Sequence, residues 1–311
     1  MKKTIYIFSY FLLVFGFFLV SLGTQAQDSL VVKRPLLATR ADSLEAGWWE
    51  RKTQLALNFA QASFNDSWQG GGISNIAVGG LFNNRSVYTK RKGVWTNQVQ
   101  FQYGFINNRG QDIRKSVDRL FLDFQFSKFI RKDLRWFTGA SFLSQFAPGF
   151  SFSTAGERQN LISSLFAPAF LSESFGLEWN PKKYLAVQLG GGTIRQTFVL
   201  NDRVLAEQLA NNENRYGLAP GQRVLNELGI QGVMSFDKDV VKNVNLKIRY
   251  QVFFAYAPEA KPVDHHVNLV AAAKVNKYMN VNFSLIAIYD QDQAATLQLS
   301  QGLAAGLSFQ L

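Results

Sequence analysis

Histidine and serine are the first residues to examine for chemistry. His265 and His266 are the two histidines of this 311-residue chain. Neighbouring residues of a strand point to opposite faces, so the pair cannot readily chelate one metal ion. A Ser-His-acid hydrolase would need one of them as its base, yet no serine lies in a Gly-x-Ser-x-Gly turn. We therefore expect no enzyme, no metal site and no cofactor. A lipid hydrolase is the least favoured alternative.

Two acidic residues and two glycine runs invite other chemistry. Asp290 and Asp292 are spaced to share one face of an extended segment, where carboxylates can bind calcium, but a polar turn explains them better. Residues 70–72 and 190–192 are all glycine. Neither run is followed by the lysine and helix of a phosphate-binding loop, so both predict strand ends or bends.

Six charged residues are more informative, because they occupy polar positions in segments where polar and apolar residues alternate. They are Arg119, Asp123, Glu227, Lys247, Arg249 and Lys274. If these segments are strands of a barrel, the six side chains face its lumen, where ionisable groups must be hydrated or paired. Two interpretations stay open: a closed lumen with paired charges, and a conducting path.

Lys247 and Arg249 are two residues apart, which places both on one face of a strand, about 7 Å from each other. Residues 237–243 are predicted to be a turn, so Glu227 is the one inward acid that we expect on the preceding strand. The positive pair would then be uncompensated. If the lumen conducts, the sequence predicts a preference for anions.

The alternation that positions these residues sets the fold class. From Leu297 to Leu311, apolar residues recur at every second position with one break, a period that a helix cannot use. Twelve such segments predict an all-β, antiparallel transmembrane β-barrel. They span residues 52–63, 74–85, 95–107, 117–128, 134–146, 165–179, 184–195, 224–236, 244–254, 265–276, 279–289 and 296–311.

Connections and aromatic residues favour a membrane barrel over a soluble sandwich. Connections after even-numbered strands are mostly short and those after odd-numbered strands mostly long, as in outer-membrane barrels with both termini in the periplasm. The long connection 196–223 contains a candidate helix near residues 202–211, which could fold over the mouth or into the lumen. Aromatic residues are predicted at both membrane interfaces. The periplasmic set includes Trp95, Trp136, Trp179, Tyr184, Tyr278 and Phe309.

The N-terminus predicts export. Residues 1–26 have a basic start, an apolar run and a small-residue cleavage site, which together are typical of a cleaved signal peptide. Residues 27–51 would form a periplasmic leader and 52–311 the barrel. The chain has no cysteine and a formal net charge of +11. Its basic residues are scattered over turns and loops, so we expect attraction to anionic lipid head groups and no nucleic-acid partner.

Four short motifs resemble one known family. They are residues 68–71 (Trp-Gln-Gly-Gly), 146–150 (Phe-Ala-Pro-Gly-Phe), 216–221 (Tyr-Gly-Leu-Ala-Pro-Gly) and 289–290 (Tyr-Asp). From about Trp48 to the C-terminus the chain is similar to a Bacteroidota outer-membrane β-barrel family of unknown function. The resemblance implies location in the cell outer membrane of that phylum and assigns no catalytic residues.

Three functions follow as expectations. The first is a non-enzymatic structural or accessory subunit of a cell-envelope complex, since no catalytic cluster is present. The second is a channel or uptake protein for small solutes, and the third is the lipid hydrolase. Expected partners are outer-membrane lipid, the barrel-assembly machinery during insertion, and envelope proteins.

Overall fold

The computed structural model describes residues 47–310 except 66, 68, 70, 71, 213, 214, 277, 278 and 293–295. The predicted signal peptide and almost all of the predicted leader lie outside the described residues. So do Tyr278 and three residues of the first motif, Trp68, Gly70 and Gly71.

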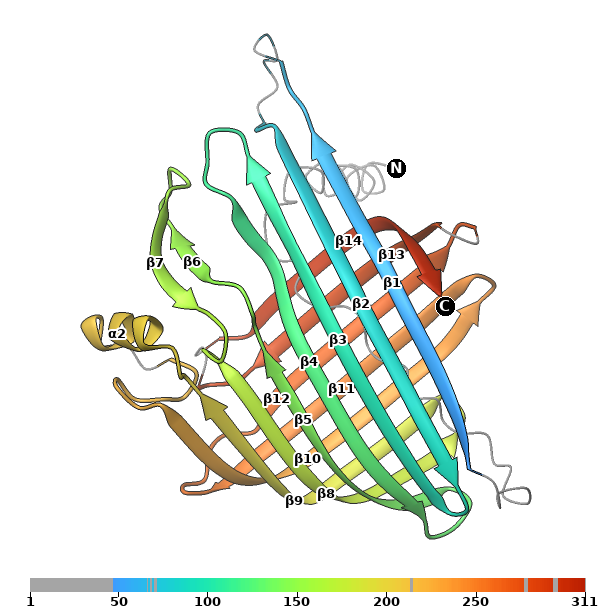
Figure 1. Ribbon diagram of the computed structural model, residues 1–311. Helices are drawn as coiled ribbons and strands as arrows, with labels where there is room; N and C mark the ends of the chain where they lie inside the picture. The colour runs from blue at the N-terminus through green and yellow to red at the C-terminus, as the bar shows by residue number, and fades with distance from the viewer. Residues whose placement is uncertain are drawn as a thin grey trace, which may run out of the picture.

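Twelve antiparallel strands form one closed barrel, in the order β1-β14-β13-β12-β11-β10-β9-β8-β5-β4-β3-β2 (Figure 1). Each strand therefore pairs with its neighbours along the chain, and β1 closes the ring against β14, as the sequence predicted. Their bounds are β1 (Trp48–Ala62), β2 (Asn75–Lys90), β3 (Gly93–Asn108), β4 (Arg114–Phe129), β5 (Leu134–Ser144), β8 (Ala169–Lys182), β9 (Leu185–Phe198), β10 (Val224–Val241), β11 (Val244–Ala257), β12 (Asp264–Lys274), β13 (Met279–Tyr289) and β14 (Gln298–Gln310).

Alternation explains which side of the wall each residue takes. On β3, Gln98 and Gln100 are buried on the inner face, whereas Trp95 and Phe101 are 45% and 43% exposed on the outer face. An apolar outer face and a polar inner face invert the usual arrangement of a water-soluble barrel. No helix in the described part of the chain is long and apolar enough to cross a membrane.

Several strands are longer than the sequence indicated. β1 begins at Trp48, so Trp48 and Trp49 belong to the barrel and not to a leader. β10 continues to Val241 through the segment that was predicted to be a turn. That prediction was wrong because residues 237–239 keep their pairing with β11 despite their turn-like composition.

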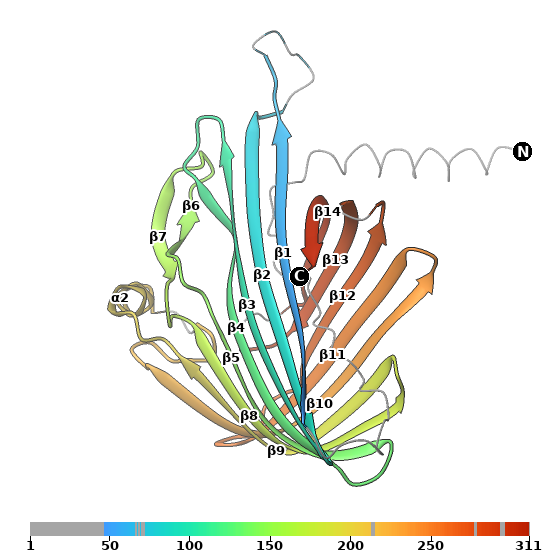
Figure 2. The ribbon, with the colours of Figure 1, turned by 45° about the vertical axis from the view of Figure 1, so that its right-hand side comes forward.

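The long connections build a cap at one end of the barrel. Between β5 and β8, β6 (Gly149–Phe152) and β7 (Arg158–Ser163) form a separate hairpin. Between β9 and β10, α2 (Asp202–Ala210) packs beside β7, as both views show (Figure 1, Figure 2). Asn201 caps α2 by accepting hydrogen bonds from the backbone N–H groups of the first turn. The cap has a small core of fully buried residues: Ala167, Val199, Val204 and Leu218.

The junction between β1 and β14 is short. Among the described residues, β1 pairs with β14 over five positions, from Gln54–Gln310 to Asn58–Gly306. In contrast, β1 pairs with β2 along its whole length, Trp48 to Ala62. Closure of the ring therefore rests on a small part of the ladder.

Candidate functional site

The six predicted charges all occupy inner-face positions. Arg119 is in register with Gln102 on β3, and Asp123 with Gln98. On β11, Arg249 faces Asn268 of β12, while Lys274 faces Asn280 near the end of the barrel opposite the cap. These residues are spread around the wall, so the structure does not bring the six together.

The proposed uncompensated pair has an acid beside it. Lys247 is directly in register with Asp237 on β10. Asp237 was not counted as an inward acid because residues 237–243 were predicted to be a turn. Asp239 lies on the same face of β10. Both carboxylates accept hydrogen bonds from the Asn245 side chain, at 3.0 and 2.8 Å. The premise behind anion preference was therefore wrong, although Lys247 and Arg249 do share a face.

A cluster of ion pairs lies at the capped end of the lumen. Arg195 on β9 is 2.8 Å from Glu227 on β10 and 2.7 Å from Asp264 on β12. Lys261, in the β11–β12 connection, is 3.0 Å from Glu227 and 2.7 Å from Asp292 in the β13–β14 connection. We call these five residues the mouth cluster. It links the β11–β12 and β13–β14 connections to the wall of β9, β10 and β12.

A bulge in β9 puts Arg195 into the lumen. On β8, Glu178 and Ser174 are four residues apart, but their partners Gln188 and Thr193 on β9 are five apart. The extra residue falls in the glycine run 190–192, where side chains do not resist the bend. It reverses the alternation, so Arg195 faces inward where an unbroken strand would turn it outward.

The central acid of the mouth cluster is buried. Glu227 is 1% exposed and accepts hydrogen bonds from two cations, Arg195 and Lys261. The Arg195 guanidinium also stacks on the Phe253 ring, 4.1 Å from its centroid. Burial lowers the pKa of Lys261, but its bonds with Asp292 and Glu227 outweigh that effect and the net pKa is raised. Lys261 therefore remains an ammonium ion at neutral pH.

The space beside the mouth cluster is small. A cavity of about 70 Å³ lies among Phe170, Thr197, Tyr216 and Asp290 and the cluster itself. Small-molecule sites usually have volumes of roughly 300–1,000 Å³. This cavity can accommodate water but not a solute of that size.

A second network lies on the inner face of β4, β5, β8 and β9, nearer the short turns. Glu178 on β8 pairs with Arg135 on β5 at 3.2 Å, and accepts hydrogen bonds from Gln125 on β4 and Gln188 on β9 at 3.0 and 2.6 Å. All four side chains are buried. Gln188 also donates to Gln125 at 3.2 Å, although β9 and β4 are three positions apart in the ring. Because adjacent strands are about 4.8 Å apart, this bond requires both side chains to reach into the lumen.

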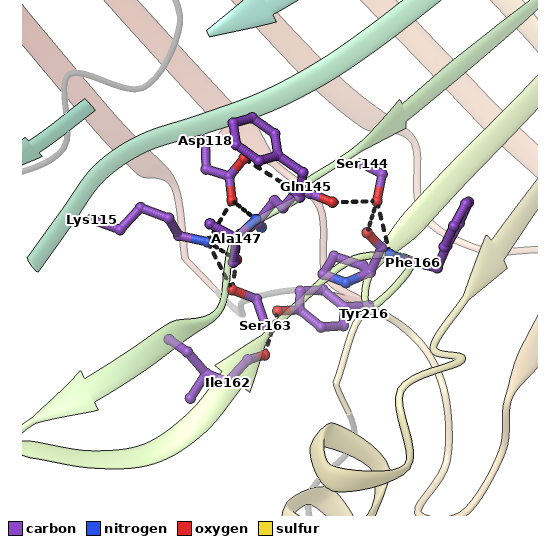
Figure 3. Close-up of polar contacts among 11 residues, drawn as sticks. Lys115, Asp118, Ser144, Gln145, Ala147, Ile162, Ser163, Phe166 and Tyr216 are labelled. Atoms are coloured by element: carbon purple, nitrogen blue, oxygen red, sulfur yellow. Dashed lines mark hydrogen bonds and ion pairs between the residues drawn. The ribbon is translucent and has the colours of Figure 1, made fainter. Parts of the chain in front are cut away.

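A third network, at the rim, holds the β6–β7 hairpin (Figure 3). Lys115 donates to Asp118 at 2.9 Å, Gln145 at 2.7 Å and the Ala147 carbonyl at 2.8 Å, with Ser163 Oγ at 3.4 Å. Asp118 also accepts the backbone N–H groups of Phe146 and Ala147. The close Ser–Lys pair resembles a catalytic dyad, but Lys115 is ion-paired with Asp118 and Ser163 is 5% exposed. Its geometry fits a structural clamp.

The other residues singled out in the sequence take ordinary places. His265 lies between Tyr250 and Tyr289, with Nδ1 2.8 Å from the Tyr250 hydroxyl, while His266 occupies the alternate face. Asp290 Oδ1 accepts the Asp292 N–H at 2.9 Å, which is a polar turn. Within the described residues, no group of three or more His, Cys, Asp or Glu could hold a metal ion.

The predicted interface aromatics point outward where their side chains are described. Trp95 and Trp179 are each 45% exposed, and Trp136 forms an edge contact with the Phe126 ring. Tyr184 packs against Phe236 in the same way. The Phe309 side chain and all of Tyr278 lie outside the described residues.

Three members of the mouth cluster, Arg195, Lys261 and Asp264, and both ionic members of the second network were missed by sequence reasoning, while Asp292 was considered only as a candidate calcium ligand. Arg195 was missed because the bulge reverses its face, and Lys261 and Asp264 because they fall in a predicted connection without a period. Glu178 and Arg135 alternate with outward tryptophans, a signal that could have found them. Their pairing, however, depends on register between strands.

Comparison with known proteins gives a family match over part of the chain. Residues 59–150 match the family described as "Protein of unknown function (DUF3078)", a stretch well short of half the chain. It includes the motifs at 68–71 and 146–150. No curated protein sequence matches the chain.

Solved structures of outer-membrane barrels resemble the fold at low similarity. The translocator domain of the autotransporter NalP from Neisseria meningitidis is 8% identical, with 86% of this chain and 90% of that chain covered and a TM-score of 0.34. A porin is 8% identical over 85% and 100%, with a TM-score of 0.32. OmpT, an outer-membrane protein of Vibrio cholerae, is 10% identical over 88% and 100%, with a TM-score of 0.29. Likeness at this level carries no argument about function.

Proposed function

We propose that this chain is an integral outer-membrane β-barrel with a closed lumen, acting as a non-enzymatic structural or accessory subunit of a cell-envelope complex. In this proposal residues 1–26 are a cleaved signal peptide, both chain termini lie in the periplasm, and the cap faces outward. The setting is the Bacteroidota envelope implied by the motifs. Lipid, the barrel-assembly machinery and envelope proteins are the partners.

The mouth cluster is the observation that carries the proposal. Two cations and three acids tie the outer connections to the wall, beside a cavity too small for a solute. The Glu178 network fills part of the lumen beside β4, β5, β8 and β9 at a different depth. The exposed apolar outer face supports a lipid setting. The closed ring supports it as well, because only a closed barrel satisfies every backbone group of a sheet in a bilayer.

Conductance tests closure. The folded wild-type protein in planar bilayers should show no steady current. The double variant Lys261→Met and Arg195→Met removes both cations of the mouth cluster and should produce brief openings. Arg223→Met is the matched control, because its partner Asp202 and Arg223 itself are exposed at the same end, and it should remain silent. Steady steps from the wild-type protein would refute a closed lumen.

A partner tests the accessory role. Under the proposal, a tagged chain extracted gently from native membranes should retain a second envelope protein at a fixed ratio through two chromatographic steps. Recovery of the barrel alone, in each of several mild detergents, would contradict an accessory role and leave the membrane assignment untouched.

A small-solute channel is the second candidate. The row Gln98, Gln100 and Gln102 on the inner face of β3, with Arg119 and Asp123 opposite, gives the polar lining that a water-filled path needs. A channel would require the mouth cluster to open. Because Asp237 is in register with Lys247, no preference for anions is expected.

A further inference from the structure

An apolar groove marks the outer face of β1, β2 and β3. Its volume is about 400 Å³, which falls within the usual range of small-molecule sites, roughly 300–1,000 Å³. The outward side chains that line it are Leu55, Leu57, Phe82, Phe101, Tyr103 and Phe146. The groove is therefore a slot of hydrocarbon and aromatic rings in an otherwise convex wall.

Gly80 makes the floor of this groove. It occupies an outward position on β2, directly in register with Leu57 on β1 and Tyr103 on β3. A Cβ at Gly80 would meet only Leu57 Cδ2, at 3.8 Å, an ordinary contact. The strand could therefore accept a larger residue at this position. The effect of glycine here is to leave the space outside the strand open. Glycine inside a strand often marks the close approach of a ligand.

Phe146 closes one end of the groove and is fixed in place. Its ring lies 5.3 Å from the Tyr103 ring, centroid to centroid. Its backbone N–H donates to Asp118 at 3.0 Å, and Asp118 in turn is held by Lys115 (Figure 3). The clamp that holds the hairpin thus also holds the end wall of the groove.

We propose that this groove binds one acyl chain of an outer-leaflet lipid as a slowly exchanging ligand. The inference rests on the proposed membrane location. The groove is continuous with the apolar outer face, opens onto it, and lies nearer the capped end of β2 than its Lys90 end. An acyl chain on a flat wall makes contacts on its lower side alone. In this groove Leu57 and Tyr103 flank the floor at Gly80 and add side contacts, so the dispersion contacts increase. Hydrocarbon walls select hydrocarbon and offer nothing to a polar peptide.

Retained lipid tests the proposal. The full chain is reconstituted into dimyristoylphosphatidylcholine vesicles and extracted into a detergent that lacks an acyl chain, and bound phospholipid is counted by native mass spectrometry. Wild-type protein should keep one phospholipid. Gly80→Leu should fill the slot and reduce occupancy roughly tenfold, since it displaces about two methylenes from contact. Gly79→Ala should behave as wild type, because it adds a methyl on the opposite face of β2, where the nearest atom is 3.8 Å away.

The outcomes separate this inference from the proposed function. If wild type and Gly80→Leu keep equal amounts of phospholipid, or neither keeps any although both float with the vesicles, the groove proposal is wrong. If the folded wild-type protein fails to float with vesicles at all, the membrane assignment fails first. Gel mobility of the folded form checks that both glycine variants have closed their barrels.

Discussion

Replacing Arg195 by methionine should destabilise the barrel more than any comparable change at the same end. Arg195 is 18% exposed and bonds two acids, one of which, Glu227, is 1% exposed. Methionine keeps an apolar stem near Phe253 but leaves Asp264 without this cation and Glu227 with Lys261 alone. Removing one partner of a buried ion pair costs about 3–5 kcal/mol. Partial exposure of Arg195 and Asp264 places the expected loss near the lower end, about 3 kcal/mol.

The assay is urea unfolding in lipid vesicles, followed by the gel mobility of the folded form, with Arg223→Met as control. Arg223 and Asp202 have side chains 50% and 84% exposed, so that pair should contribute only about 0–1 kcal/mol. Adding Glu227→Gln to Arg195→Met should restore part of the loss, because it removes the charge left under-compensated. Equal midpoints for Arg195→Met and Arg223→Met would refute the argument that the mouth cluster is energetically important.

Three other predictions concern orientation, the outer face and the wall charges. A cysteine at Asn212 should react with an impermeant reagent on intact cells and one at Lys182 only after the outer membrane is opened; equal reaction at both would overturn the topology. Leu307→Arg should block insertion, since a lipid-facing arginine costs about 2–4 kcal/mol near the midplane, while Leu307→Ala should still give the folded gel band. Lys247→Glu places an acid directly opposite Asp237 and should lower the unfolding midpoint by the equivalent of about 0.2–1 kcal/mol. Adding Asp237→Lys should restore the midpoint. A double variant as unstable as the single one would contradict the pairing.

The barrel was predictable because its signal repeats. Twelve segments with a period of two each specify a face, and the chain order of strands then follows from short turns. The closed ring of twelve confirms this prediction. The extent of β10 was not predictable from composition, because residues 237–239 look like a turn and are kept in the strand by their pairing with β11.

The site was less predictable because it depends on departures from that repeat. Glu227 was placed on the inner face by alternation alone. To place Arg195 on the inner face one must know that β9 contains a bulge. A glycine run indicates that the strand can bend there, but it does not tell how many extra residues the bulge contains. Lys261 and Asp292 reach Glu227 from connections whose path is set by tertiary packing. Local pattern therefore defines the wall, while the residues of the mouth cluster are brought together by non-local geometry.

The short junction between β1 and β14 also has a kinetic consequence. It joins positions as far apart in the chain as Gln54 and Gln310, whereas the other neighbouring strands of the ring follow one another along the chain. The entropic cost of closing a loop grows with the length of chain enclosed. The few residue pairs of this junction stabilise too little to offset that cost until the hairpins have formed a curved sheet. The ring should therefore form from its hairpins first and zip shut last. Amide hydrogens of this junction should exchange ahead of those of the β2–β3 ladder, which makes it the place where the finished barrel opens first.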